Sequence, residues 1–238
     1  MGGALLRAWL AAGLGRWRVI DPALPEAPEG AGLGPGTLPP ELVVLAVKPQ
    51  VWREVLAGLD VPEAAVVVSV MAGVPVAALA AALPGRRIVR AMPNTPAAIG
   101  QGVSGLFGGD AGARAMVEPL FSAAGTALWL SAEEEFHALT GLSGSGPAYV
   151  FAFIEALAAA GEAAGLAAEV AMALARGTVT GAAALAALDP AEADELRRRV
   201  TSPGGTTAAG LAVLMPGLGP LLDETVKAAA ARSRELAG

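Results

Sequence analysis

Short apolar runs alternate with alanine-rich segments in the first half of the chain. The apolar runs are largely unbroken valine, leucine and isoleucine, a pattern typical of strands that are buried on both faces. They predict strands at residues 18–20, 42–47, 65–71, 87–92 and, with a weaker signal, 126–130. The alanine-rich segments predict helices at residues 4–12, 50–59, 75–83 and 111–124. This alternation indicates an α/β fold with a doubly wound parallel sheet.

The pattern changes near Ser131, after which the sequence predicts helices alone. Ser131 and Glu134 have the spacing of a capping box, and Asp189 followed by Pro190 is typical of a helix start. The Pro/Gly-rich stretch 22–41 is expected to be a loop. The predicted helices lie at residues 132–141, 147–164, 167–186, 190–199, 206–214 and 220–236. We therefore expect two domains, an α/β domain at 1–130 and an all-α domain at 131–238.

The helical half is apolar enough to raise the question of a membrane span, since the mean hydropathy of the chain is +0.56. A span requires about 20 apolar residues with few charges. Glu155, Glu162, Glu169 and Arg176 interrupt the most apolar stretch at seven-residue intervals and would form a charged stripe. We therefore expect two closely packed, buried helices and no membrane contact. The start of the chain lacks a signal-peptide pattern, so the expected location is cytoplasmic.

Charge and composition exclude several classes of function. The net charge of −6 gives no general attraction to nucleic acid, and the basic run 197–199 is expected to be a solvated helix face. The absence of cysteine excludes disulfides, thiol nucleophiles and zinc–thiolate sites. His137 is the only histidine and is expected on a helix surface, so no metal site is predicted.

Three predicted strands end in short loops that a doubly wound sheet would bring to one edge. The loops are Lys48-Pro49-Gln50, Ala72-Gly73-Val74 and the segment 93–96. Ligands of such sheets bind beyond the carboxyl ends of the strands. Backbone N–H groups, one lysine and one asparagine there would suit a phosphorylated cofactor. The alternative is that all three are ordinary strand-to-helix turns.

Two loops of small residues precede predicted helices in the second half. They are the segments 142–149 and 201–207, which are rich in glycine, serine and threonine. The free N–H groups and the dipole at a helix N-terminus favour an anion such as a carboxylate. The alternative is that both are plain helix–helix connections.

Five motifs in these regions resemble those of the pyrroline-5-carboxylate reductase family, in the same order and spacing. They are AVKPQ (46–50), MAGV (71–74), RAMPNTPA (90–97), LSGSGPAYVF (142–151) and VTSPGGTTAAGL (200–211). The last motif is the family's signature, and the resemblance covers essentially the whole chain. It implies a Rossmann-like nucleotide-binding domain followed by an all-α dimerisation domain that pairs two subunits.

The same resemblance implies a reaction, the last step of proline biosynthesis. In it 1-pyrroline-5-carboxylate is reduced to L-proline by a hydride from NADPH, with NADH as a possible donor. A cyclic imine is activated by protonation, so the reaction needs alignment, an anion site and a hydrogen-bonding group rather than a metal. The implied partners are this small-molecule substrate and a second copy of the chain, in a homodimer or larger homo-oligomer.

The resemblance also implies roles for individual residues. Thr207 would be the catalytic residue, with its hydroxyl near the imine nitrogen. The substrate would be bound by Ser202, Gly204, Gly205, Thr206, Ser145 and Gly146. The cofactor would be bound by Gly2, Ala46, Val47, Lys48, Pro49, Ala72, Gly73, Val74, Met92, Pro93, Asn94 and Thr95.

The first residues depart from the family's pattern. The family begins with a strand and a G-x-G-x-M-G turn, of which Met1-Gly2 resembles only the end. One account is that the sequence starts at an internal methionine of a longer protein. The other is a shortened, catalytically impaired homo-oligomer with weak or no nucleotide binding. We favour the first account, because every later motif is intact.

Two further alternatives concern the cofactor and the substrate. The predicted strand at 18–20 leads into Asp21, and an acidic residue there tends to accept from a ribose 2′-hydroxyl and to repel a 2′-phosphate. The preference between NADPH and NADH is therefore open. A related dehydrogenase of 6-phosphogluconate or hydroxyisobutyrate would need a catalytic lysine in the second domain. Lys227, near the end of the chain, is the only lysine there, so this alternative is poor.

Overall fold

The computed structural model describes residues 1–237, which form two compact units. The first unit consists of Met1–Ser145 together with the chain from Ala228 onward. The second unit consists of Gly146–Lys227. The division at Ser145 lies later than the predicted domain boundary at 130/131, because the segment after residue 131 packs within the first unit.

A five-stranded sheet forms the centre of the first unit, in the order β3-β4-β5-β6-β7. Neighbouring strands are parallel except for β5 and β6, which pair antiparallel with Ala91 opposite Leu106. The antiparallel strand β6 was not predicted. The strands are β3 (Leu42–Leu45), β4 (Val66–Ser69), β5 (Arg87–Pro93), β6 (Gly102–Gly108) and β7 (Gly125–Trp129).

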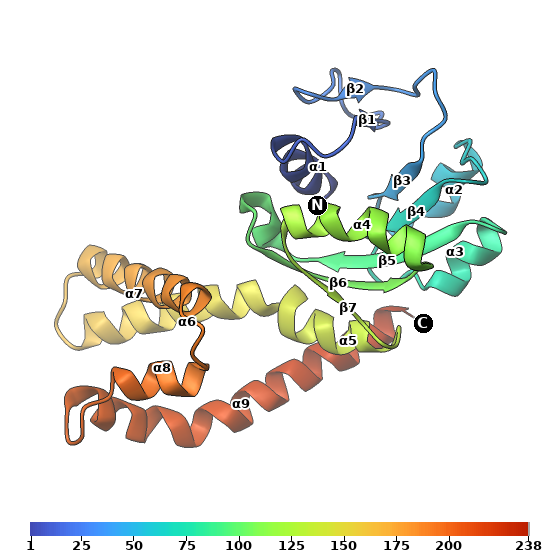
Figure 1. The fold of residues 1–238 in the computed structure, drawn as a ribbon. Helices are drawn as coiled ribbons and strands as arrows, with labels where there is room; N and C mark the ends of the chain where they lie inside the picture. The colour runs from blue at the N-terminus through green and yellow to red at the C-terminus, as the bar shows by residue number, and fades with distance from the viewer. Residues whose placement is uncertain (238) are drawn as a thin grey trace. The chain divides into compact units, whose positions relative to one another are not determined.

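Two short strands, β1 (Arg18–Val19) and β2 (Gly32–Leu33), form a separate parallel pair. Figure 1 shows this pair apart from the five-stranded sheet. The stretch 22–41 was predicted to be loop throughout, but β2 lies within it. The side chain of Arg18 holds the pair together, because its Nε donates to the backbone oxygen of Gly34 at 2.7 Å.

Helices cover both faces of the five-stranded sheet, which confirms the doubly wound fold. On one face Val66 and Val68 of β4 pack into a core with α1 and α4, and on the other Val67 packs into a core with α2 and α3. Alternate residues of one strand are thus buried on opposite faces, as the unbroken valine run predicts. The helices are α1 (Gly2–Ala11), α2 (Trp52–Ala57), α3 (Val76–Ala82) and α4 (Ala111–Ala123), with a 3₁₀ turn at Thr95–Ile99.

The segment after β7 returns to the first unit through helix α5 (Glu135–Leu139) and a π-helical turn at Thr140–Gly144. Phe136 is fully buried there. The predicted capping box is wrong, because Glu134 stands at the N-cap without a side-chain bond, and Glu135 accepts from the Ser131 N–H instead. His137 is half-buried rather than a simple surface residue.

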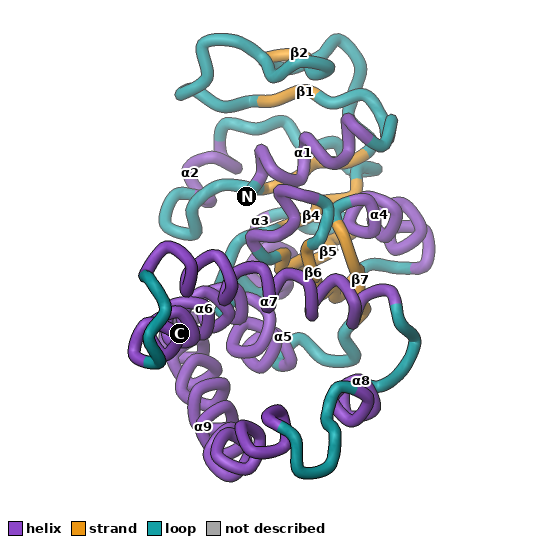
Figure 2. Tube along the Cα trace, turned by 90° about the vertical axis from the view of Figure 1, so that its left-hand side faces the viewer, coloured by secondary structure: helices purple, strands orange, loops and turns teal. Residues whose placement is uncertain are grey.

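The second unit contains only helices among its described residues. Helices α6 (Gly146–Ala163) and α7 (Ala168–Leu188) run side by side, as Figure 2 also shows. They approach closely, because a Cβ built on Gly161 would lie 3.2 Å from the Cβ of Ala171. Close packing of the two helices is confirmed, but their burial is not: within one chain Phe151 of α6 is 61% exposed. Two helical stretches, Glu135–Ala163 and Ala168–Leu188, are long and apolar enough to cross a membrane by length and composition, which is weak evidence for a span.

Two predicted boundaries in this unit are wrong. A helix was predicted at 190–199, but α8 (Ala193–Arg199) begins three residues later. Asp189 is the C-cap of α7, and its carboxylate accepts from the Ala191 N–H in the turn between the two helices. Helix α9 (Thr206–Ala237) is continuous through Pro216 and Pro220, whereas two helices were predicted, at 206–214 and 220–236. The basic run 197–199 is a solvated helix face, as predicted. Arg198 and Arg199 bond the Glu195 carboxylate on the same helix, and these bonds lower the pKa of Glu195.

Candidate active site

The carboxyl ends of β3, β4 and β5 lie next to one another, because these three strands are adjacent and parallel. The predicted cofactor loops 46–49, 72–74 and 92–95 follow these ends and therefore share one edge of the sheet. Ala46, Lys48 and Ala72 are exposed there. Gly73 has a φ of 74°, a backbone conformation that only glycine adopts without strain. The structure thus brings together the three loops that the sequence singles out.

The N-terminus of α1 lies at the same edge. A Cβ built on Gly2 would be 2.8 Å from the Cβ of Ala46, so the helix begins directly against the end of β3. The Ala4 and Leu5 N–H groups both bond the Met1 oxygen. The N–H groups of Gly2 and Gly3 have no carbonyl within the helix to bond, and no side chain caps this end. An anion such as a diphosphate is favoured at such a terminus.

Asn94, predicted to bind the cofactor, is bonded to the protein. Its Nδ2 donates to the backbone oxygen of Ser143 at 3.1 Å and to the Ser143 hydroxyl at 3.2 Å. Its Oδ1 accepts from the Val103 N–H at 2.8 Å. The residue as a whole is 9% exposed. Asn94 therefore braces β5, β6 and the π-helical turn, and three of its four hydrogen-bonding sites are already used.

The π-helical turn brings a predicted substrate residue to the sheet edge that the predicted cofactor loops share. The Ser145 N–H closes this turn by donating to the Thr140 oxygen at 2.8 Å. A Cβ built on Gly144 would lie 3.8 Å from the Cε of Met92, at the end of β5. Gly144 therefore faces the loop at 92–95, and Ser145 is the next residue in the chain. Wide turns of this kind are frequent at functional sites.

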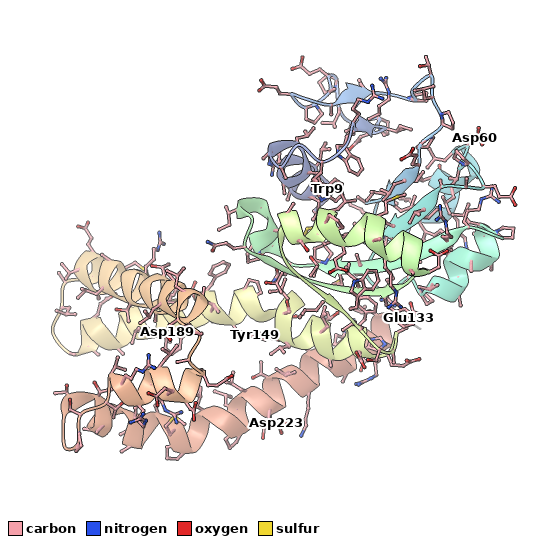
Figure 3. All side chains as sticks on the ribbon, in the orientation of Figure 1. Trp9, Asp60, Glu133, Tyr149, Asp189 and Asp223 are labelled. Atoms are coloured by element: carbon pink, nitrogen blue, oxygen red, sulfur yellow. The ribbon has the colours of Figure 1, made fainter. Side chains whose placement is uncertain are left out.

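A small cavity of about 200 Å³, lined in part by charged side chains, opens beside the loop at 72–74. Glu133, which sequence reasoning missed, organises it: its Oε1 accepts from Arg90 Nη1 at 2.9 Å and from the Val76 N–H at 2.8 Å. Arg90 is 7% exposed, and its guanidinium lies 4.3 Å from the centroid of the Phe136 ring. Figure 3 shows Glu133 beside α5. Glu133 thus fixes the start of α3, directly behind the Gly73 loop.

His137 borders the same cavity. Its Nδ1 lies 3.0 Å from the Ser233 hydroxyl on α9. Burial, followed by the positive charges of Arg234 and Arg90, lowers the pKa of His137 below 6.5, against the opposing effect of Glu134. The lowered pKa favours the neutral imidazole, which can form a hydrogen bond with the Ser233 hydroxyl.

The predicted substrate loop lies in the second unit and leads into α9. Gly204 has a φ of 68°, and the Gly205 N–H donates to the Ser202 oxygen at 3.0 Å. The first intrahelical bond runs from the Ala209 N–H to the Gly205 oxygen. The N–H groups of Thr206 and Thr207 therefore have no carbonyl within the helix to bond. Their side chains are exposed, so the structure presents both hydroxyls and N–H groups to a ligand.

Across 1–237 no group of three or more histidine, cysteine, aspartate or glutamate side chains is placed to hold an ion.

Comparison with known proteins identifies relatives of the chain. The family model for the pyrroline-5-carboxylate reductase dimerisation region matches residues 133–236. The pyrroline-5-carboxylate reductase of Pseudomonas aeruginosa is 45% identical over 205 residues, which cover 83% of this chain and 75% of that protein. No comparison favours the alternative of an impaired relative.

Solved structures extend the match to the whole chain. A pyrroline-5-carboxylate reductase from Coxiella burnetii superposes with a TM-score of 0.90 at 33% identity, covering 100% of this chain and 95% of the other. The pyrroline carboxylate reductase of Plasmodium falciparum, solved with NADP bound, gives a TM-score of 0.81 at 25% identity, with the same coverage of both chains.

Proposed function

The chain belongs to the pyrroline-5-carboxylate reductase family, and from this premise we propose that it reduces 1-pyrroline-5-carboxylate to L-proline with NAD(P)H. The observation that carries the proposal is the shared edge at which the Gly2 terminus and the loops after β3, β4 and β5 meet. A dinucleotide binds across such an edge in doubly wound folds. The identity of the substrate is inferred from the relatives, which are named for this reaction.

The residues of this edge fit a dinucleotide. The close contact of Gly2 with Ala46 leaves no room for a larger residue, and the unpaired N–H groups of Gly2 and Gly3 would bond a diphosphate. Lys48 is exposed beside them and would add a positive charge. The main chain at Gly73 would lie along the cofactor without a side chain in between. When bound, the reduced nicotinamide supplies the hydride.

The loop at 201–207 would bind the substrate. The N–H groups at the start of α9 would hold the carboxylate, with Ser202, Gly204, Gly205 and Thr206 around it. The Thr207 hydroxyl would bond the imine nitrogen and keep its proton in place. The C=N carbon accepts the hydride, the nitrogen keeps the proton, and the product is the secondary amine of proline. Ser145 and Gly146 would flank the ring.

A homodimer in the cytoplasm completes the proposal. The dimerisation region matched by the family model includes α6 and α7, whose apolar side chains are exposed in the single chain. A second copy would cover them. A cytoplasmic location is consistent with a reaction that draws on the cell's pool of reduced nicotinamide cofactor.

The test is to incubate the full chain with 1-pyrroline-5-carboxylate and NADH or NADPH, and to identify proline by mass spectrometry. Thr207→Ala is expected to lower kcat by about 10² to 10⁴ with little change in cofactor affinity, because it removes a group at the reacting nitrogen. Thr225→Ala, on the same helix, is the matched control and should leave turnover unchanged. Equal losses of cofactor affinity and turnover in Thr207→Ala would contradict the role given to this hydroxyl.

A further inference from the structure

We propose that Asp21 makes this enzyme select NADH over NADPH, by accepting a hydrogen bond from the ribose 2′-hydroxyl and repelling a 2′-phosphate. The inference rests on the proposed function, since it specifies which form of the cofactor the reductase takes. It departs from the expectation of NADPH that the family resemblance gives.

The course of the chain directs Asp21 toward the edge at which α1 begins. Helix α1 starts there, at Gly2, and runs away from it. The chain then reverses, because Trp17 stacks on Trp9 near the end of α1, with ring centroids 4.5 Å apart. Strand β1 begins beside this far end and runs back, and Asp21 follows its last residue by two positions.

Strand β2 supports the same direction. A Cβ built on Gly30 would lie 3.3 Å from the Leu10 side chain, so β2 also begins near the far end of α1. Strands β1 and β2 are parallel, with Arg18 opposite Gly32. Both strands therefore end toward the edge at which α1 begins.

The position of Asp21 is the one from which such folds recognise the ribose. In dinucleotide-binding folds an acidic residue about 20 residues after the glycine turn accepts a hydrogen bond from the ribose 2′-hydroxyl. Asp21 stands at this interval from Gly2, after the strand that follows α1.

The carboxylate of Asp21 is both fixed and accessible. Its Oδ1 accepts from the Ala23 N–H at 2.9 Å, which closes a turn and sets the orientation of the side chain. The residue is exposed, and within residues 1–237 no protein donor bonds its Oδ2. One oxygen is thus held by the backbone, and the other is available to a hydroxyl.

The surroundings disfavour a 2′-phosphate. Between residues 21 and 41 the chain has four carboxylates, at Asp21, Glu26, Glu29 and Glu41, and no arginine, lysine or histidine. Arg18, on β1 itself, is already bonded to the backbone oxygens of Leu33 and Gly34. A phosphate that carries nearly two negative charges would meet like charge without a cation from this segment.

The effect should be large enough to measure by binding alone. A hydrogen bond to a charged group contributes about 1.5–3 kcal/mol, which corresponds to roughly tenfold or more in affinity. We therefore expect the Kd of the full chain for NADPH to exceed its Kd for NADH by about tenfold or more. Adenosine 5′-phosphate should likewise bind more tightly than adenosine 2′,5′-bisphosphate, which tests the ribose contact without the nicotinamide.

Variants assign the preference to one side chain. Asp21→Ser should weaken NADH and strengthen NADPH, so that the ratio of the two Kd values approaches one. Adding Ala23→Arg should reverse the ratio, because it supplies a cation for the phosphate. Glu63→Gln removes an exposed carboxylate that precedes β4, at the opposite end of the strand from the loop at 72–74, and should leave the ratio unchanged. Thermal unfolding of each variant shows whether it is folded.

The outcomes separate this inference from the proposed function. Tighter binding of NADPH than NADH by the wild type would overturn it, and so would equal weakening of both cofactors in Asp21→Ser; in either case turnover of 1-pyrroline-5-carboxylate would leave the reductase assignment standing. A folded protein that binds neither cofactor and forms no proline would contradict both.

Discussion

Gly2 and Ala46 touch so closely that a Cβ added to Gly2 would lie 2.8 Å from the Cβ of Ala46. This contact joins the first turn of α1 to the end of β3, and its two residues lie 44 positions apart in the sequence. It fixes where the unpaired N–H groups of the helix point, and it therefore connects packing directly to the proposed binding of a diphosphate.

Gly2→Ala should weaken nucleotide binding. The added methyl group overlaps Ala46, and relieving an overpacked contact of this kind costs about 1–3 kcal/mol, either as strain or as displacement of α1. We expect the Kd for the preferred cofactor to rise by about five- to a hundredfold if that cost falls on binding. Fluorescence titration measures this Kd.

Gly3→Ala is the matched control for this substitution. A Cβ on Gly3 would meet only the flexible Arg7 side chain, at 3.7 Å. Alanine is also the better helix former by about 1 kcal/mol, so this variant should bind normally and unfold at a slightly higher temperature. If both variants bind equally well, the contact with Ala46 does not position the helix terminus.

Glu133→Ala should destabilise the first unit. The substitution leaves Arg90, which is 7% exposed, without its carboxylate partner and the Val76 N–H without an acceptor. Because Glu133 is itself 21% exposed in its side chain, we expect a loss of about 2–4 kcal/mol, somewhat below that of a fully buried pair. Urea denaturation measures the change in the free energy of unfolding.

Glu134→Ala removes a neighbouring carboxylate that is exposed, so the change should stay within about 0.5 kcal/mol. Similar losses in the Glu133 and Glu134 variants would show that net charge matters rather than the bridge to Arg90.

The pH dependence of stability should carry the signature of His137. Its folded pKa lies below the ordinary 6.5, so in acid the unfolded chain binds more protons than the folded one. The stability that depends on a neutral His137 imidazole is therefore fully present above about pH 6.5 and is lost as the pH falls further. The free energy of unfolding of the wild type should fall more steeply between about pH 7 and 5 than that of His137→Asn. Parallel curves would contradict the shift.

Phe151→Glu should weaken self-association. Phe151 lies on α6 and is 61% exposed in the single chain, within the region that the dimerisation model matches. Burying a glutamate against an apolar partner face costs several kcal/mol, so the dimer Kd should rise by at least a hundredfold. Sedimentation equilibrium measures it. Leu38→Glu, at a 72% exposed position of the first unit, should leave the dimer intact, and a wild-type monomer would refute the proposed assembly.

The strands β3, β4 and β5 and the loops that follow them could be predicted from the sequence, because the pattern that identifies each of them lies in consecutive residues. Val66, Val67 and Val68 form an unbroken apolar run, and Gly73 follows five residues later. Strand β6 was missed because three of its seven residues are glycine, which has low strand propensity, and because it depends on antiparallel pairing with β5.

Contacts distant in sequence account for the other differences. Glu133 gains its role only when β5 and the start of α3 come beside it, so no local pattern identifies it. Asn94 belongs to a recognisable motif, but its bonds to Ser143 and Val103 depend on the tertiary fold. Helix α9 continues through Pro216 and Pro220, although proline in a helix interior is a strong local signal for a break.

The most direct test of the account follows the hydride itself. The full chain is incubated with 1-pyrroline-5-carboxylate and NADH that carries deuterium at the transferred position of the nicotinamide, and the proline formed is analysed by mass spectrometry and NMR. The account predicts L-proline with one deuterium on the ring carbon that was doubly bonded to nitrogen. Cofactor oxidation without labelled proline, or a folded protein that forms no proline with either NADH or NADPH, would contradict it.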